Sequence, residues 1–299
     1  MSEIVENTKI KKKINLKNDI IFKAFFSRKG NEKYLIDFLN AILKIEITKI
    51  QVKEEVNLEQ LSTTEKGGRL DIQAILNDGM IVNIEMQMKN LNDIEQRNDI
   101  YEAKTISRYF PRGGEYKKAK EVIAIYILNY NLFGFDDYIL DTVKVLNKHR
   151  DYQVNSISKE YYIQLPKFRE SNPDMNDKLN QWLAVIDDED RGRIEMAKAK
   201  NKIIEEAEVE IKYFTADEEA RYLADLRDMW ESDRNSEIGD AEERGKEERN
   251  KGTVSKNGKK ENQLEIAKKL LNIGMDVKEI AKITELEVKE IEELIKGIK

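Results

Sequence analysis

The chain has 299 residues, of which 40% are hydrophobic and 37% are charged, with 14 Gly and only 3 Pro. This composition is typical of a globular, helix-rich protein with a sizeable core, and it excludes collagen-like and Pro-rich disordered chains. The absence of cysteine excludes disulfides, thiolate metal sites and a cysteine nucleophile. The net charge of −6 is uneven, because residues 151–240 are strongly acidic whereas residues 1–150 carry a small basic excess. A nucleic-acid partner is therefore expected to meet the first half of the chain.

The sequence predicts no membrane partner. Its longest strongly apolar run, residues 122–128, is far shorter than the roughly 20 residues that a spanning helix needs. The first residues lack the apolar stretch of a signal peptide. We therefore expect a cytoplasmic protein.

Hydrophobic periodicity predicts the elements of the first half of the chain. Two helices broken near Gly30 are expected at residues 19–43, followed by three strands at residues 45–56, 69–76 and 80–88. A helix that ends before Pro111 is expected at residues 93–110, and a strand buried on both faces at residues 121–130. This order of helix, strands, helix and strand predicts an α/β fold.

The second half of the chain is mainly helical by the same criteria. Residues 161–166 predict one edge strand, and the acidic residues after it predict amphipathic helices. Residues 1–150 are expected to form a core, and residues 151–238 an acidic helical extension. Residues 239–262 are expected to form a charged Gly-containing linker or a solvated single helix, and residues 263–299 a segment of three short helices.

The two alternating segments fix the register of their own pairing. In residues 70–76 and 82–88, every even position is apolar, and the odd positions 69, 71, 73, 83, 85 and 87 are polar. Both apolar sets must face one core, which excludes a two-residue turn. A three-residue loop with Gly79 in the left-handed conformation pairs residue 76 with residue 80 and keeps even positions opposite even positions. In this register Asp71 lies opposite Glu85, and Arg69 lies opposite Gln87.

Asp71 and Glu85 are opposed carboxylates, which repel each other unless a cation lies between them. A divalent ion is the simplest compensation, because Mg²⁺ takes one or two carboxylates together with water and phosphate oxygens. Gln87, on the same face, can hold a water or a phosphate oxygen but supplies no positive charge. The alternative is a solvent face on which Arg69 and nearby lysines neutralise the two carboxylates.

These residues resemble the PD-(D/E)XK nuclease superfamily and, more narrowly, the recombination-promoting nuclease (Rpn) family, whose members are often labelled transposases. The resemblance extends over about residues 15–135. It is carried by the segments at residues 18–26, 39–43, 69–72, 82–87 and 114–116.

The resemblance implies a restriction-endonuclease-like mixed sheet flanked by helices, and a DNA endonuclease that uses Mg²⁺ or another divalent cation such as Mn²⁺ or Ca²⁺. It implies no small-molecule cofactor. Asp71 and Glu85 match the metal-binding carboxylates, and Asp19 matches an acidic position of the first helix. Gln87 stands where the superfamily usually has a catalytic Lys, although Glu-x-Gln is the usual form in the narrower family. Leu70 replaces the superfamily Pro.

The helix after the paired strands carries a stripe of cations and one aromatic residue. Arg97, Tyr101, Lys104 and Arg108 follow one another at i, i+4, i+7 and i+11. With Arg69, this stripe is a candidate for contacts with the phosphate backbone of DNA beside the metal. A solvated helix face is the alternative interpretation.

The C-terminal helices resemble a helix-turn-helix in spacing, but the second of the pair, residues 286–298, carries four glutamates. Carboxylates facing phosphates disfavour DNA reading, so a packing or self-association module is the favoured interpretation. The leading hypothesis for the whole chain is a metal-dependent DNA endonuclease of the transposase-like kind. The alternatives are a catalytically silent DNA-binding or self-associating protein with the same fold, and an interaction module whose acidic helices bind a protein.

Overall fold

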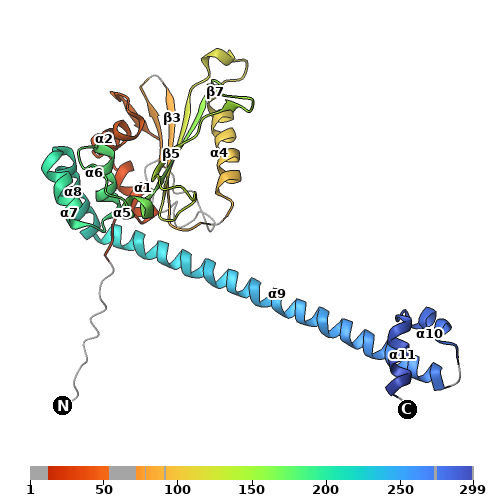
Figure 1. Ribbon diagram of the computed structural model, residues 1–299. Coiled ribbons are helices and arrows are strands. Elements are labelled where there is room, and N and C mark those ends of the chain that lie inside the picture. The colour runs from red at the N-terminus through yellow and green to blue at the C-terminus, as the bar shows by residue number, and fades with distance from the viewer. Residues whose placement is uncertain (1–12, 54–71, 78, 91, 273–274, 298–299) are drawn as a thin grey trace, which may run out of the picture. The chain divides into compact units, whose positions relative to one another are not determined.

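The computed structural model describes residues 13–53, 72–77, 79–90, 92–272 and 275–297. The chain divides into two compact units, Met1–Trp230 and Glu231–Lys299 (Figure 1).

The first unit is built around a six-stranded mixed sheet. Its strand order is β1-β2-β3-β4-β8-β5. The strands are β1 (Ile50–Val52), β2 (Ile72–Leu76), β3 (Met80–Gln87), β4 (Val122–Leu128), β8 (Ser158–Gln164) and β5 (Ile139–Asp141). The pairs β3/β4 and β4/β8 are parallel, and the other pairs are antiparallel. A separate two-stranded sheet pairs β6 (Val145–Leu146) with β7 (His149–Gln153).

Helices cover both faces of this sheet (Figure 1). They are α1 (Asp19–Ser27), α2 (Glu32–Leu43), α4 (Ile94–Tyr109), the short 3-10 helix η1 (Tyr116–Lys118), α5 (Leu165–Glu170), α6 (Lys178–Asp187), α7 (Arg191–Lys200), α8 (Lys202–Ala216) and α9 (Glu218–Asn272), whose first turns belong to this unit. The predicted α/β fold with a mixed sheet flanked by helices is confirmed.

The pair of strands β2 and β3 has the predicted register. Leu76 pairs with Met80 and Ile72 pairs with Ile84. Gly79 has φ +102°, as the three-residue loop requires. Arg69 and Asp71, the expected partners of Gln87 and Glu85, lie outside the described residues.

The alternation of β2 and β3 divides the sheet into two chemically different faces. The side chains at their even positions pack with residues of β4 and of helices α1, α2 and α5 to α9 in the main core, around Phe22, Phe26 and Trp182. On the opposite face a smaller cluster contains Ile94 of α4 and Tyr162 of β8. All seven residues of β4 are buried, as predicted, because this strand lies between the two clusters.

The structure differs from the expected elements in three places. Of the strand expected at residues 45–56, the described part contains only the short β1. The expected edge strand is wrong: β8 lies inside the sheet, parallel to β4, and β5 forms the edge instead. The boundary expected at residue 150 falls inside β7, since the sheet continues through β8.

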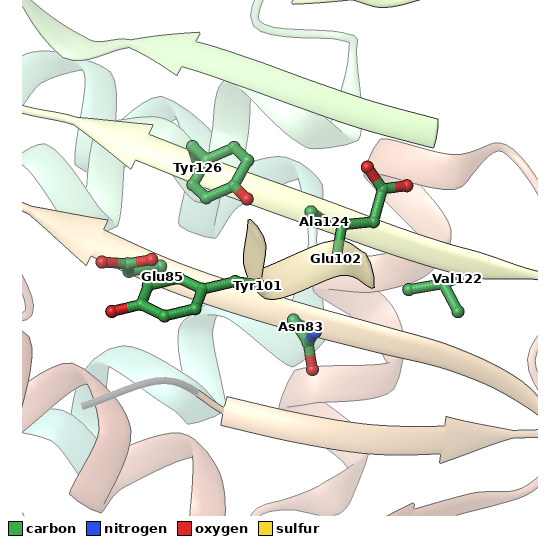
Figure 2. Close-up of a pocket in the computed structure, with 7 residues that line it drawn as sticks. All are labelled: Asn83, Glu85, Tyr101, Glu102, Val122, Ala124 and Tyr126. Carbon is green, nitrogen blue, oxygen red and sulfur yellow. The ribbon is translucent and has the colours of Figure 1, made fainter. Parts of the chain in front are cut away.

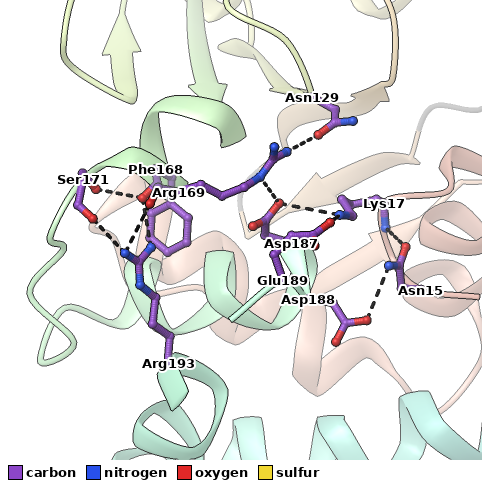
Figure 3. A network of polar contacts seen from close by, with 10 residues as sticks. All are labelled: Asn15, Lys17, Asn129, Phe168, Arg169, Ser171, Asp187, Asp188, Glu189 and Arg193. Atoms are coloured by element: carbon purple, nitrogen blue, oxygen red, sulfur yellow. Dashed lines mark hydrogen bonds and ion pairs between the residues drawn. The ribbon is translucent and has the colours of Figure 1, made fainter. Parts of the chain in front are cut away.

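A buried ion-pair network fixes the end of β4 to the helices (Figure 3). Arg169 donates to the buried carboxylate of Asp187 at 2.9 Å and to Asn129, the residue after β4. Burial raises the pKa of Asp187, and the charges of Arg169 and Lys17 oppose that shift. Asn129 in turn donates its backbone N–H to the carbonyl of Gln87 at 2.8 Å. The network therefore reaches the C-terminal end of β3.

The second unit is helical. The rest of α9 continues without a break through residues 239–262, and α10 (Val277–Thr284) and α11 (Val288–Gly297) follow it. The buried core of the unit consists of Ala267, Ile280, Leu286 and Ile291. Within the described part of the chain, none of the helices has the length and apolar character to cross a membrane.

Gly79→Ala is expected to lower the free energy of unfolding by roughly 1–2 kcal/mol, because an L-residue is strained at φ +102°. Thermal unfolding followed by circular dichroism measures the effect. Gly134→Ala is the matched control, since its φ is not positive and a Cβ there meets no atom within 4 Å. Equal melting temperatures for both variants would contradict the conformational argument.

Candidate active site

The polar side chains at odd positions of β2 and β3 are joined to α4 by hydrogen bonds. Tyr109 donates its hydroxyl to Gln73 at 2.7 Å, and Gln73 donates to Asn83 at 2.8 Å. Asn83 donates in turn to Thr105 at 3.3 Å. These side chains are therefore not fully exposed to solvent, because α4 covers them and is hydrogen-bonded to them.

Glu85 lies further along β3 and is held by its neighbour Gln87. The Gln87 amide donates to Glu85 Oε1 at 2.8 Å, and its carbonyl oxygen accepts a hydrogen bond from the Tyr130 hydroxyl at 2.8 Å. Gln87 is only 8% exposed. Burial raises the pKa of Tyr130 to about 12, so its hydroxyl stays protonated at neutral pH and remains a donor. The orientation of the Gln87 amide is thereby fixed.

Arg97 of α4 adds a cation next to this carboxylate. Its guanidinium lies 3.5 Å from Glu85 Oε1, the oxygen that also accepts from Gln87. Among the described residues, Glu85 Oε2 has no hydrogen-bond partner. Arg97 Nε is buried and likewise has no acceptor among them. A carboxylate and a guanidinium side by side are suited to bind a cation and an anionic oxygen together.

A pocket opens beside Glu85, between β3, β4 and α4 (Figure 2). Its lining consists of Asn83, Glu85, Tyr101, Glu102, Val122, Ala124 and Tyr126. Ala124 is the small residue of β4 on this face, and the lack of a larger side chain leaves space over the centre of the sheet. Glu85 and Glu102 thus contribute carboxylates to the same pocket.

A second group of carboxylates lies on the same face. Asp99 and Glu102 of α4 and Glu160 of β8 each place an oxygen within 4.8 Å of the others. Burial and the charge of Glu160 raise the pKa of Glu102 to about 7, with a smaller contribution from Asp99 and an opposing one from Lys144. The sequence did not predict this group of carboxylates. Asp99 and Glu102 have a helical i, i+3 spacing, but their partner comes from a strand whose position in the sheet was not predicted correctly.

Asp19 makes a different contact from the one expected of a metal ligand beside Glu85. It is 8% exposed, and Arg227 Nε lies 2.7 Å from one carboxylate oxygen and 2.9 Å from the other. It belongs to α1, whose apolar residues pack in the main core. Its assignment to the metal therefore remains a prediction, and the structure pairs it with an arginine.

The predicted stripe of α4 has two parts. Arg97 and Tyr101 are half-buried near Glu85, whereas Lys104 and Arg108 are exposed. Lys104 lies over the ring of Tyr101, with its Nζ 5.7 Å from the centroid. The stripe therefore begins at the candidate site and leads outward along the helix.

The mixed sheet, with one apolar face and one face of acidic and amide side chains, defines a restriction-endonuclease-like α/β protein. A sequence profile described as "PD-(D/E)XK nuclease family transposase" matches residues 16–241, more than half of the chain. This chain belongs to that family, as the resemblance implied. Searches of curated proteins and of solved structures found no match.

Glu102→Gln is expected to make stability less dependent on pH. Between the ordinary glutamate value of 4.5 and about 7, native Glu102 holds a proton that the unfolded chain has released. The free energy of unfolding of the wild type therefore falls as the pH rises through this window. The melting temperature, measured in the presence of chelator, should fall less between pH 5 and pH 8 for the variant than for the wild type.

Glu95→Gln is the control for this prediction, because Glu95 is exposed in the first turn of the same helix. The prediction is wrong if Glu102→Gln melts below the wild type at pH 8, since Glu102 would then stabilise the protein as an anion.

Proposed function

We propose that this chain is a metal-dependent DNA endonuclease with a recombination-promoting, transposase-like role. The observation that carries the proposal is the Glu85 carboxylate, which lines the pocket and which Gln87 holds by one oxygen at 2.8 Å. Membership of a nuclease family supports the same reading. Hydrolysis of a phosphodiester bond is the reaction that this site would carry out.

The chemistry of the donor set fits a hard divalent cation. Glu85 supplies an uncommitted carboxylate oxygen, and we assign Asp71, which directly precedes β2, as the second ligand. Two carboxylates with room for water and phosphate oxygens suit Mg²⁺, Mn²⁺ or Ca²⁺. Such an ion supplies a more acidic bound water and neutralises charge on the phosphate.

The protein's own side chains would divide the remaining tasks. Gln87 orients Glu85 and is itself oriented by Tyr130. Arg97, whose guanidinium lies 3.5 Å from Glu85, would supply positive charge next to the reacting group. Lys104 and Arg108, exposed further along α4, would contact the neighbouring phosphates of the DNA strand.

One observation favours the rival function, a DNA-binding protein that keeps the fold without catalysis. The Gln87 amide has its carbonyl and one of its N–H groups engaged by Tyr130 and Glu85, and it carries no charge. DNA retention that depends on salt, without any metal-dependent nicking, would favour this rival.

Glu85→Gln is expected to abolish metal-dependent nicking of supercoiled plasmid, with a loss of at least about 10²-fold, because the amide cannot serve as an anionic ligand. Nicking is compared with Mg²⁺ and with chelator. Asp71→Asn should behave in the same way if Asp71 is the second ligand.

Glu95→Gln again serves as the control, because it removes an exposed carboxylate ten residues along the chain from Glu85. If Glu85→Gln nicks as fast as this control, the assignment of Glu85 fails. Melting curves of all the variants exclude unfolding as the cause of lost activity.

Tyr130→Phe is expected to lower the rate of nicking at saturating DNA by several-fold while leaving DNA affinity nearly unchanged. The variant removes the hydrogen bond that orients Gln87 but no charge that faces the phosphate. Stability should fall by about 1 kcal/mol, because the carbonyl of a buried amide loses its donor. A loss of affinity with an unchanged rate would show instead that Tyr130 contacts DNA.

A further inference from the structure

The hairpin formed by β6 and β7 extends beyond the main sheet. It continues the pair of β5 and β8, as the hydrogen bonds from Thr142 N–H to the Glu160 carbonyl and from Val154 N–H to the Lys144 carbonyl show. Every residue from 141 to 155 is exposed. A two-stranded ribbon with both faces in water is marginally stable by itself, so its exposed faces need a reason.

The hairpin carries apolar and basic side chains side by side. Its exposed large apolar residues are Val143, Val145, Leu146, Tyr152 and Val154, with Tyr152 62% exposed. An exposed patch of this kind on a folded protein indicates an interaction surface. Residues 143–154 contain Lys144, Lys148 and Arg150 against a single carboxylate, Asp151, in a chain whose net charge is −6, and Asp141 lies at the base of the hairpin. The partner that fits this surface is therefore anionic.

The position of the hairpin connects it with the candidate active site. The charge of Lys144 acts on Glu102 and Glu160, so the base of the hairpin lies beside α4. From Arg97, which contacts Glu85, the stripe of α4 extends 11 residues to Arg108, or about 16 Å along a helix. It leads toward the end of the sheet from which the hairpin projects (Figure 1).

The stripe on α4 is long enough to contact more than one phosphate, because successive phosphates of one DNA strand are closer together than the two ends of the stripe. A strand that enters at Glu85 and follows Lys104 and Arg108 would bring the flanking duplex to the hairpin. A two-stranded ribbon has the width to enter the major groove, where basic side chains meet phosphates and apolar ones meet the groove wall.

We propose that the β6–β7 hairpin is a second DNA-contact site, which holds the duplex that flanks the cleaved phosphodiester. Lys148 and Arg150 contact phosphates, and Tyr152 packs against the sugar or base edges. This inference rests on the proposed function for the direction in which the DNA runs. The contact itself does not require that the chain cleaves DNA.

The test measures binding of the full-length chain to a labelled DNA duplex of about three helical turns, in chelator and over a range of salt concentrations. The double variant Lys148→Gln/Arg150→Gln should bind about tenfold more weakly at physiological salt. Its plot of log affinity against log salt should be less steep by about 2, since two phosphate contacts are removed. Tyr152→Ala should weaken binding without changing this slope.

The matched control is Lys29→Gln/Lys202→Gln. It removes two exposed lysines, one shortly after α1 and one at the start of α8, and the apolar residues of these two helices pack against the sheet face opposite α4. All substituted residues are exposed, so melting temperatures should not change. The inference is overturned if the hairpin variant and the control have the same affinity and slope, or if the wild type does not bind the duplex. It is also overturned if the hairpin variant only dissociates an oligomer and retains DNA affinity.

Plasmid nicking with Mg²⁺ separates this inference from the proposed function. Hairpin-dependent binding without any nicking supports the contact site and rejects the endonuclease. Nicking that depends on Glu85 but is identical in the hairpin variant and in the control, with equal DNA affinities, supports the endonuclease and rejects the contact site.

Discussion

The placement of an apolar side chain at every even position of β2 and β3 is the constraint on which the candidate site depends. Even positions such as Ile72 and Ile84 must be buried in the main core, so the odd positions necessarily emerge together on the other face. There they meet α4, which follows β3 in the chain and returns along the sheet. A row of acidic and amide groups is thereby held on a rigid strand, as a catalytic constellation needs.

The covering helix is attached by contacts that leave room for chemistry. Tyr109 and Thr105 bind the amides of the strands by hydrogen bonds, while Ile94 supplies the apolar contact at the other end of α4. Between these contacts the small Ala124 leaves the pocket that Glu85 and Glu102 share. The raised pKa of Glu102 follows from the same geometry, because covering the sheet buries this carboxylate of the helix and also brings it close to Glu160 of β8.

The sequence predicted the parts of the fold that repeat a pattern over several residues. The register of β2 and β3 follows from the apolar residues at their even positions, and the burial of β4 follows from its unbroken apolar run. β5 was missed, because three residues are too few to show a period. Without β5, β8 was assigned to the edge, and the meeting of Glu160 with Glu102 could not be predicted. Tyr130 was missed for a related reason, since it reaches Gln87 from the loop after β4.

The exchange of the usual lysine for Gln87 can be reconciled with a reaction that needs positive charge. A lysine at position 87 would extend from β3 toward Glu85, where the uncharged amide now donates its hydrogen bond. Arg97 reaches the same carboxylate from α4, so a cation is present in the site although it comes from another element. A guanidinium keeps its proton under all ordinary conditions and offers several donors, which makes it better suited to hold a phosphate than to take part in proton transfer. In this arrangement the strand positions the carboxylate and the helix supplies the charge, so the candidate site would be complete only when α4 is docked.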